Sequence, residues 1–102
     1  MRISVRQSGG FAGIDVELGS VDTASLAAAE ADGIAEVLRR AGFDQLPENV
    51  PGAAGADFLR YDITLENQGR SRRVAFADDA SEGSRRLLEV LETLRPHLRL
   101  GN

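Results

Sequence analysis

Two stretches near the N-terminus alternate apolar with polar residues, and a glycine-rich segment separates them. The apolar members of the alternation are Ile3, Val5, Ile14, Val16 and Leu18. A period of two predicts two strands that each bury one face. The segment between them, residues 8–13, reads SGGFAG, and glycine adopts positive φ at little steric cost. The pattern therefore predicts an antiparallel hairpin whose turn carries one aromatic side chain, Phe11.

After Asp22 the apolar residues recur every three or four positions, as in a helix that buries one face. These residues are Leu26, Ile34, Val37, Leu38 and Ala41. Asp22 or Ser25 is the expected N-cap, and Gly42 occupies the place of a left-handed C-cap. Gly33 within this helix costs about 1 kcal/mol relative to alanine, so we expect it to allow close packing against a strand.

The second half of the chain repeats this order of elements. Alternation around Tyr61 predicts a third strand, the turn at residues 67–69 reverses the chain, and Val74 and Phe76 belong to a fourth strand. A final helix follows, with Ser81 or Ser84 as N-cap and Pro96 at its end or at a kink. Its apolar stripe consists of Leu87, Leu88, Leu91, Leu94 and Leu98. The order ββαββα predicts an α+β two-layer sandwich, in which a four-stranded antiparallel sheet carries two helices on one face.

Residues 43–56 contain prolines and glycines and have no period. A connection of this length is either a functional loop or a return path over the first helix. A return path along the helix places both hairpin turns, residues 8–13 and 67–70, at one end of the sheet. A loop that folds locally places them at opposite ends, and the sequence leaves both arrangements open.

Composition sets the class of protein. The chain has 102 residues, of which 42% are hydrophobic and 27% charged, as expected of one globular domain spanning residues 1–102. The net charge of −4 argues against a nucleic-acid partner. The sequence lacks an apolar run long enough for a membrane span or a signal peptide, so we expect no membrane partner and a cytoplasmic location.

Catalytic chemistry finds little support in the residue types. His97 is the single histidine and there is no cysteine, which disfavours a protein-held zinc site. Asp78 and Asp79 are adjacent and suit a helix start or a solvated turn better than a carboxylate pair. Gly9-Gly10 lacks the strand–loop–helix context of a phosphate loop. We therefore expect no enzyme, no cofactor, no metal site and no small-molecule substrate.

Three segments and the leucine-rich final helix carry a family resemblance. The segments are residues 1–14, MRISVRQSGGFAGI, residues 57–61, DFLRY, and residues 74–78, VAFAD. Together they resemble the emfourin family of protealysin-associated inhibitors. The resemblance implies a cytoplasmic inhibitor of thermolysin-like zinc metallopeptidases. The implied protease-binding residues are Ser8, Gly9, Gly10, Phe11, Ala12 and Gly13 and, on a looser match, Asp57 and Tyr61.

Elementary physics is compatible with that role. A glycine-rich hairpin is narrow enough to enter a cleft, and Phe11 can fill an apolar pocket as an anchor. The alternatives stay open: the ring of Phe11 folds back on its own sheet, Tyr61 belongs to the core, and Asp57 caps the start of a strand. A second hypothesis for the whole chain is a small interaction or regulatory module that binds another protein through the same turn.

Overall fold

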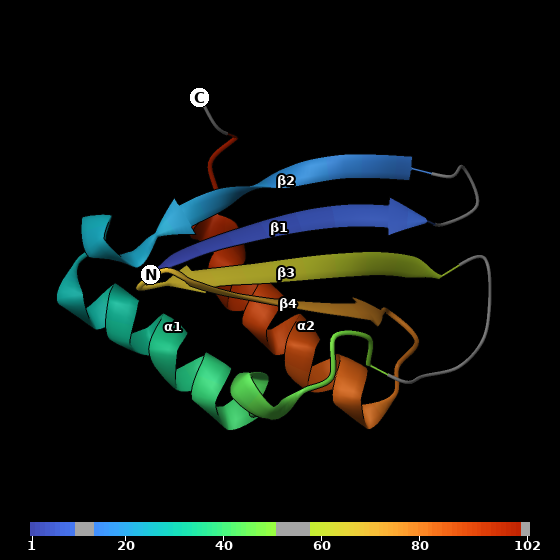
Figure 1. Cartoon of the computed structure of the whole chain (residues 1–102). Helices are drawn as coiled ribbons and strands as arrows, with labels where there is room; N and C mark the ends of the chain where they lie inside the picture. The colour runs from blue at the N-terminus through green and yellow to red at the C-terminus, as the bar shows by residue number, and fades with distance from the viewer. Residues whose placement is uncertain (10–13, 51–57, 101–102) are drawn as a thin grey trace.

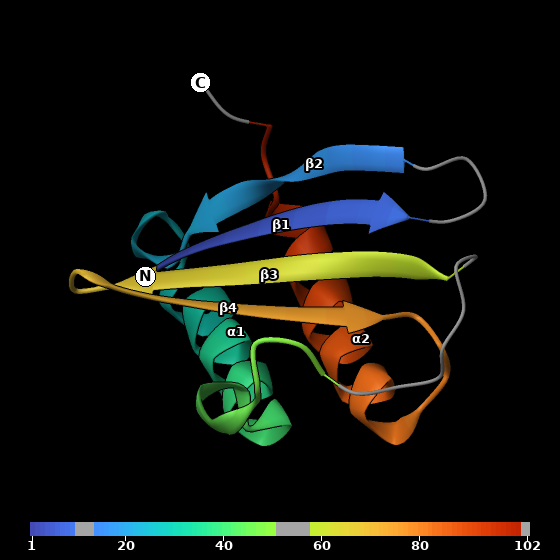
Figure 2. The same ribbon diagram turned by 45° about the vertical axis from the view of Figure 1, so that its right-hand side comes forward.

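The fold is described from a computed structural model of residues 1–9, 14–50 and 58–100. The main elements are β1 (Arg2–Gly9), β2 (Ile14–Asp22), α1 (Ala28–Ala41), β3 (Leu59–Asn67), β4 (Arg70–Ala77) and α2 (Glu82–Leu94). Three short 3-10 helices, η1 (Thr23–Ser25), η2 (Phe43–Gln45) and η3 (Arg95–His97), are additions to the expected order. The α+β class is confirmed, with one four-stranded antiparallel sheet and two helices. Figures 1 and 2 show both helices on the same face of the sheet.

The strand order is β2-β1-β3-β4, so β1 and β3 are the central strands. Gly9 of β1 faces Leu59 of β3, whereas Asn67 of β3 faces Arg70 of β4. The strand ends that lead into residues 10–13 therefore lie at one end of the sheet, and the β3–β4 turn lies at the other. Of the two arrangements that the sequence left open, the structure has the one with the hairpins closing at opposite ends (Figure 1).

The core lies between the inner face of the sheet and the two helices. Its fully or nearly fully buried members include Ile3, Val5, Ile34, Val37, Tyr61, Ile63, Val74, Phe76, Leu87, Val90, Leu91 and Leu94. Tyr61 and Phe76 face each other across β3 and β4, with ring centroids 5.5 Å apart. This aromatic pair joins the two strands of the second hairpin on their inner side.

The start of the first helix differs from the prediction. Asp22 caps the short η1 instead, because its Oδ1 accepts a hydrogen bond from the Ala24 N–H at 3.0 Å. Ser25 ends η1, and Leu26 is extended with φ −97° and ψ 161°. This extended residue interrupts the helical path, so α1 begins only at Ala28. The prediction that Asp22 or Ser25 caps the long helix is wrong.

The glycines of the first helix have different roles. Gly42 is the left-handed C-cap with φ 65°, and its N–H bonds to the carbonyls of Leu38 and Arg39, as predicted. Gly33 is exposed, and a Cβ added to it would meet no heavy atom within 4 Å. The expectation that Gly33 allows close packing against a strand is therefore wrong.

The predicted cap of the second helix is confirmed. The Ser81 hydroxyl accepts a hydrogen bond from the Ser84 N–H at 3.3 Å. Ser84 is itself buried, and its Oγ donates to the Ala77 carbonyl at 2.7 Å, which ties the first turn of α2 to the end of β4. Pro96 lies in η3, directly after α2 ends at Leu94.

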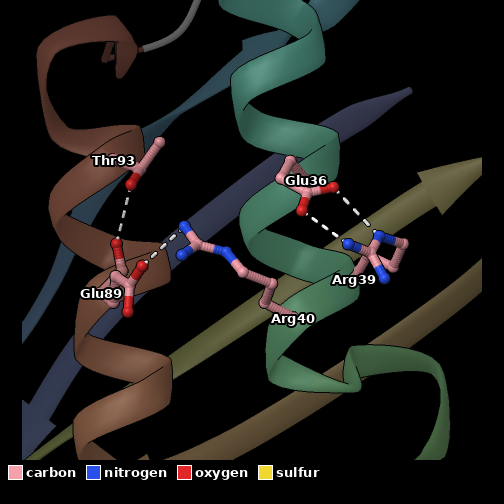
Figure 3. A network of polar contacts seen from close by, with 5 residues as sticks. All are labelled: Glu36, Arg39, Arg40, Glu89 and Thr93. Carbon is pink, nitrogen blue, oxygen red and sulfur yellow. Dashed lines mark hydrogen bonds and ion pairs between the residues drawn. The ribbon is translucent and has the colours of Figure 1, made fainter.

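The outer side of the helices carries exposed ion pairs, one of which joins α1 to α2 (Figure 3). Arg40 of α1 contacts Glu89 of α2 at 2.8 Å, and the Thr93 hydroxyl donates to the Glu89 carbonyl at 2.9 Å. Arg39 binds Glu36 within α1 at 2.6 Å. Pairs this exposed contribute little stability, so the apolar contact beneath them holds the helices together. Within the described ranges, neither helix has the length and apolarity that a membrane crossing requires.

Candidate functional site

Four strand termini define one end of the sheet, which we call the Gly9 end. There β1 stops at Gly9, β2 starts at Ile14, β3 starts at Leu59 and β4 stops at Ala77. Gly9 faces both Ile14 and Leu59 in the ladder. Gly9, which precedes segment 10–13, is therefore a direct neighbour of Phe58 and Leu59, which follow segment 51–57. The pairing of β1 with β3 brings together two segments far apart in the sequence, both containing residues that the resemblance implicated.

Gly9 has the conformation and the surroundings that favour glycine. Its φ is +80°, which side chains rarely adopt. A Cβ at this position would lie 3.0 Å from the Phe58 carbonyl oxygen and 3.7 Å from Cγ of Arg60. The end of β1 thus lies directly against the chain that enters β3. The glycine pattern indicated a turn here, but only the β1–β3 pairing reveals Phe58 as a neighbour.

The outer face of the Gly9 end carries charged residues in cross-strand contact. Arg6 Nη2 lies 2.8 Å from Asp15 Oδ1, and this hydrogen bond, together with the charge of Asp15, raises the pKa of the Arg6 guanidinium. Both side chains are exposed. Ser8 is half-buried and faces Asp15 in the ladder. On the neighbouring strands Arg73 lies 3.1 Å from Asp62, so opposite charges pair across strands on this face.

Tyr61 is placed differently from the edge residues. It retains 4% exposure and packs against Phe76 in the core. This position matches the alternative in which Tyr61 is a core residue, and a direct contact with a protease stays a proposal. Gly10, Phe11, Ala12, Gly13 and Asp57 lie outside the described residues, so their implicated roles remain predictions.

Hollows in the described surface lie away from the Gly9 end. Two of them share Asp44, Leu65 and Asn67 in their lining and are located between η2 and the β3–β4 turn. A third lies between the helices beside Arg40 and Glu89. None of the residues that line these three hollows belongs to the described part of the Gly9 end.

Residues considered for catalysis occupy structural positions. Asp79 Oδ1 accepts a hydrogen bond from the Ser81 N–H at 3.0 Å, just before α2. This matches the turn role that the sequence offered as one alternative, because α2 itself is capped by Ser81. His97 is half-buried in η3. In the parts of the chain that the structure describes, no three histidine, aspartate or glutamate side chains gather into a group that could hold a metal ion.

Comparison with known proteins gives one match. A protein-family model described as Emfourin matches residues 5–92, which is most of the chain. The matched range includes both segments that meet at the Gly9 end. No curated protein and no solved structure matches the chain.

Proposed function

Because the chain belongs to the Emfourin family, we propose that it blocks the active-site cleft of a thermolysin-like, protealysin-type zinc metallopeptidase. Family membership implies a metallopeptidase-inhibitor domain with a protease as its partner. The observation that carries the proposed binding mode is the register in which Gly9 faces Leu59. This register places Ser8 and Gly9 beside Leu59 and Arg60 at one end of the sheet, which supports a binding surface there.

The body of the domain suits this task. β1 is hydrogen-bonded on both sides, to β2 and to β3, along its length. A binding segment that extends from such a strand loses less conformational entropy on binding than a free loop does. In this proposal, the backbone of residues 8–13 lies along the substrate groove and Phe11 fills the apolar pocket beside the zinc. Asp57 contacts the rim of the cleft, and Tyr61 supports the neighbouring strand from inside.

Inhibition assays test the proposal. The purified chain is titrated against a protealysin-type enzyme with a fluorogenic peptide substrate, and an unrelated zinc protease serves as the specificity control. We expect inhibition at one inhibitor per enzyme and competition with substrate. Arg70→Ala, in the turn at the opposite end of the sheet, is a matched surface control and should inhibit like the wild type. Absence of inhibition at micromolar concentration against several thermolysin-like enzymes would instead favour a regulatory module with another partner.

We also propose that the inhibitor acts in the cytoplasm. Cell fractionation with an antibody against the chain tests this location. Recovery mainly outside the cytoplasmic fraction would contradict it.

A further inference from the structure

Other parts of the chain cover each of the two edge strands of the sheet at one place. Along β4, the Ala75 N–H donates to the Glu48 carbonyl at 2.7 Å, and the Val50 N–H donates to the Ala75 carbonyl at 2.9 Å. Along β2, Ser20 and Arg99 exchange two backbone hydrogen bonds of 2.9 and 3.0 Å. Each edge is thus protected at one place from pairing with other strands.

The cover on β2 ends at Gly19. A Cβ on Gly19 would lie 2.8 Å from the Arg99 carbonyl oxygen, so the approach of the C-terminal segment requires glycine here. The stretch Asp15–Leu18 lies between this point and the Gly9 end. No described residue forms a backbone hydrogen bond to the outer edge of this stretch.

The ladder shows which backbone groups point outward from the uncovered stretch. In an antiparallel pair, every second residue turns its N–H and C=O away from the partner strand, and Ser20 does so because it bonds to Arg99. The register shifts by one residue at the bulge after Val5. Continuing past that bulge, Glu17 and then Asp15 turn their N–H and C=O groups outward.

From this geometry we infer that the edge of β2 at Asp15–Leu18 pairs, strand to strand, with an extended segment of the target metallopeptidase. The inference rests on the proposed function. β2 begins immediately after residues 8–13, so a protease that encloses those residues has its cleft wall beside Asp15 and Glu17. Val16 between them is 46% exposed, and docking of a strand along this edge would cover it.

A second copy of the chain fits this edge poorly. Antiparallel self-pairing about Val16 would set Asp15 of one copy against Glu17 of the other on the same face. Like charges directly opposite each other destabilise a strand pair. Both carboxylates are exposed. Their repulsion therefore opposes pairing of this edge with the same edge of a second copy.

Proline substitution tests the outward N–H of Glu17. This N–H does not take part in the β1–β2 ladder, and proline is accepted at edge positions of this kind. Glu17→Pro should raise Ki about five- to tenfold, as expected for the loss of one intermolecular hydrogen bond. Ser71→Pro is the matched control, because Ser71 has the same outward orientation on β4 at the far end of the sheet. Ser71→Pro should stay within about twofold of wild-type Ki.

Amide exchange of the wild-type chain gives an independent readout that does not depend on how a variant folds. In the complex, the amides of Asp15 and Glu17 should exchange at least about tenfold more slowly than in the free chain, while that of Ser71 is unchanged. Full inhibition by Glu17→Pro together with unprotected Asp15 and Glu17 amides would overturn the inference and leave the inhibitory function standing. Absence of any inhibition would overturn both. Concentration-dependent protection in the free chain, with a dimer in sedimentation, would assign the edge to a second copy instead.

Discussion

Replacing Gly9 with alanine tests how closely the end of β1 is held against the chain entering β3. Gly69, in the β3–β4 turn, provides a matched control. The two glycines have nearly the same φ, +80° and +79°. A Cβ at Gly9 would lie 3.0 Å from the Phe58 carbonyl oxygen, whereas a Cβ at Gly69 would meet no heavy atom within 4 Å. The pair of variants therefore separates backbone strain from the contact with Phe58.

The magnitudes follow from these two terms. Positive φ destabilises alanine by about 1–2 kcal/mol, and the loss of unfolded-state freedom offsets about 0.4–1 kcal/mol. Gly69→Ala should thus lower the free energy of unfolding by about 1 kcal/mol. At Gly9 the Phe58 carbonyl must also shift, which adds about 1 kcal/mol, so Gly9→Ala should cost about 2 kcal/mol. For a domain of this size each kcal/mol corresponds to a Tm change of about 4–8 °C.

Thermal unfolding and inhibition are measured on both variants. Gly9→Ala should melt below Gly69→Ala and raise Ki about tenfold or more, because the displaced chain carries the proposed binding segments. Gly69→Ala should inhibit like the wild type at temperatures where it is folded. Equal stability losses would refute the close contact with Phe58. An equal rise in Ki for the two variants would refute the placement of the site at the Gly9 end.

The remaining predictions concern the turn residue and two stabilising contacts. Phe11→Ala should raise Ki about 30-fold or more, as for a buried anchor worth about 2 kcal/mol, and should change Tm little. A parallel loss of stability would place the ring in the core. Arg72 donates to two backbone carbonyls of the segment containing η2. Arg72→Ala should therefore lower the free energy of unfolding measured in urea by about 2 kcal/mol. An unchanged midpoint would show these bonds to be dispensable. A double-mutant cycle on Arg40 and Glu89 should give a coupling of about 0.5 kcal/mol that fades in 1 M salt; a salt-independent coupling would contradict a solvent-exposed pair.

The strands and the second helix could be predicted from the sequence because their signals are local. Alternation around Val5 and Ile63 fixed which face is buried, and Ser81 and Gly42 marked helix ends by their capping chemistry. The start of α1 was missed for a local reason too. Asp22 accepts a hydrogen bond from the Ala24 N–H and caps the short η1. Its capping chemistry therefore marks the start of η1 and not the start of α1.

The arrangement of the candidate site could not be predicted in this way. Which hairpin end lies beside which strand depends on the pairing of β1 with β3, and no residue near Gly9 or Phe58 encodes that register. The two edge covers are equally non-local, since Glu48–Val50 and Arg99 reach their strands from other parts of the chain. Gly19 is a local sign that another segment approaches β2 closely. The glycine alone does not reveal that this segment contains Arg99.

A crystal structure of the chain bound to a protealysin-type metallopeptidase would show which end of the sheet meets the enzyme. We expect residues 8–13 to occupy the active-site cleft, with Leu59 beside them and the turn at residues 67–70 in solvent. A complex in which the turn at residues 67–70 or the outer helix faces fill the cleft, with Gly9 far from the enzyme, would contradict this expectation.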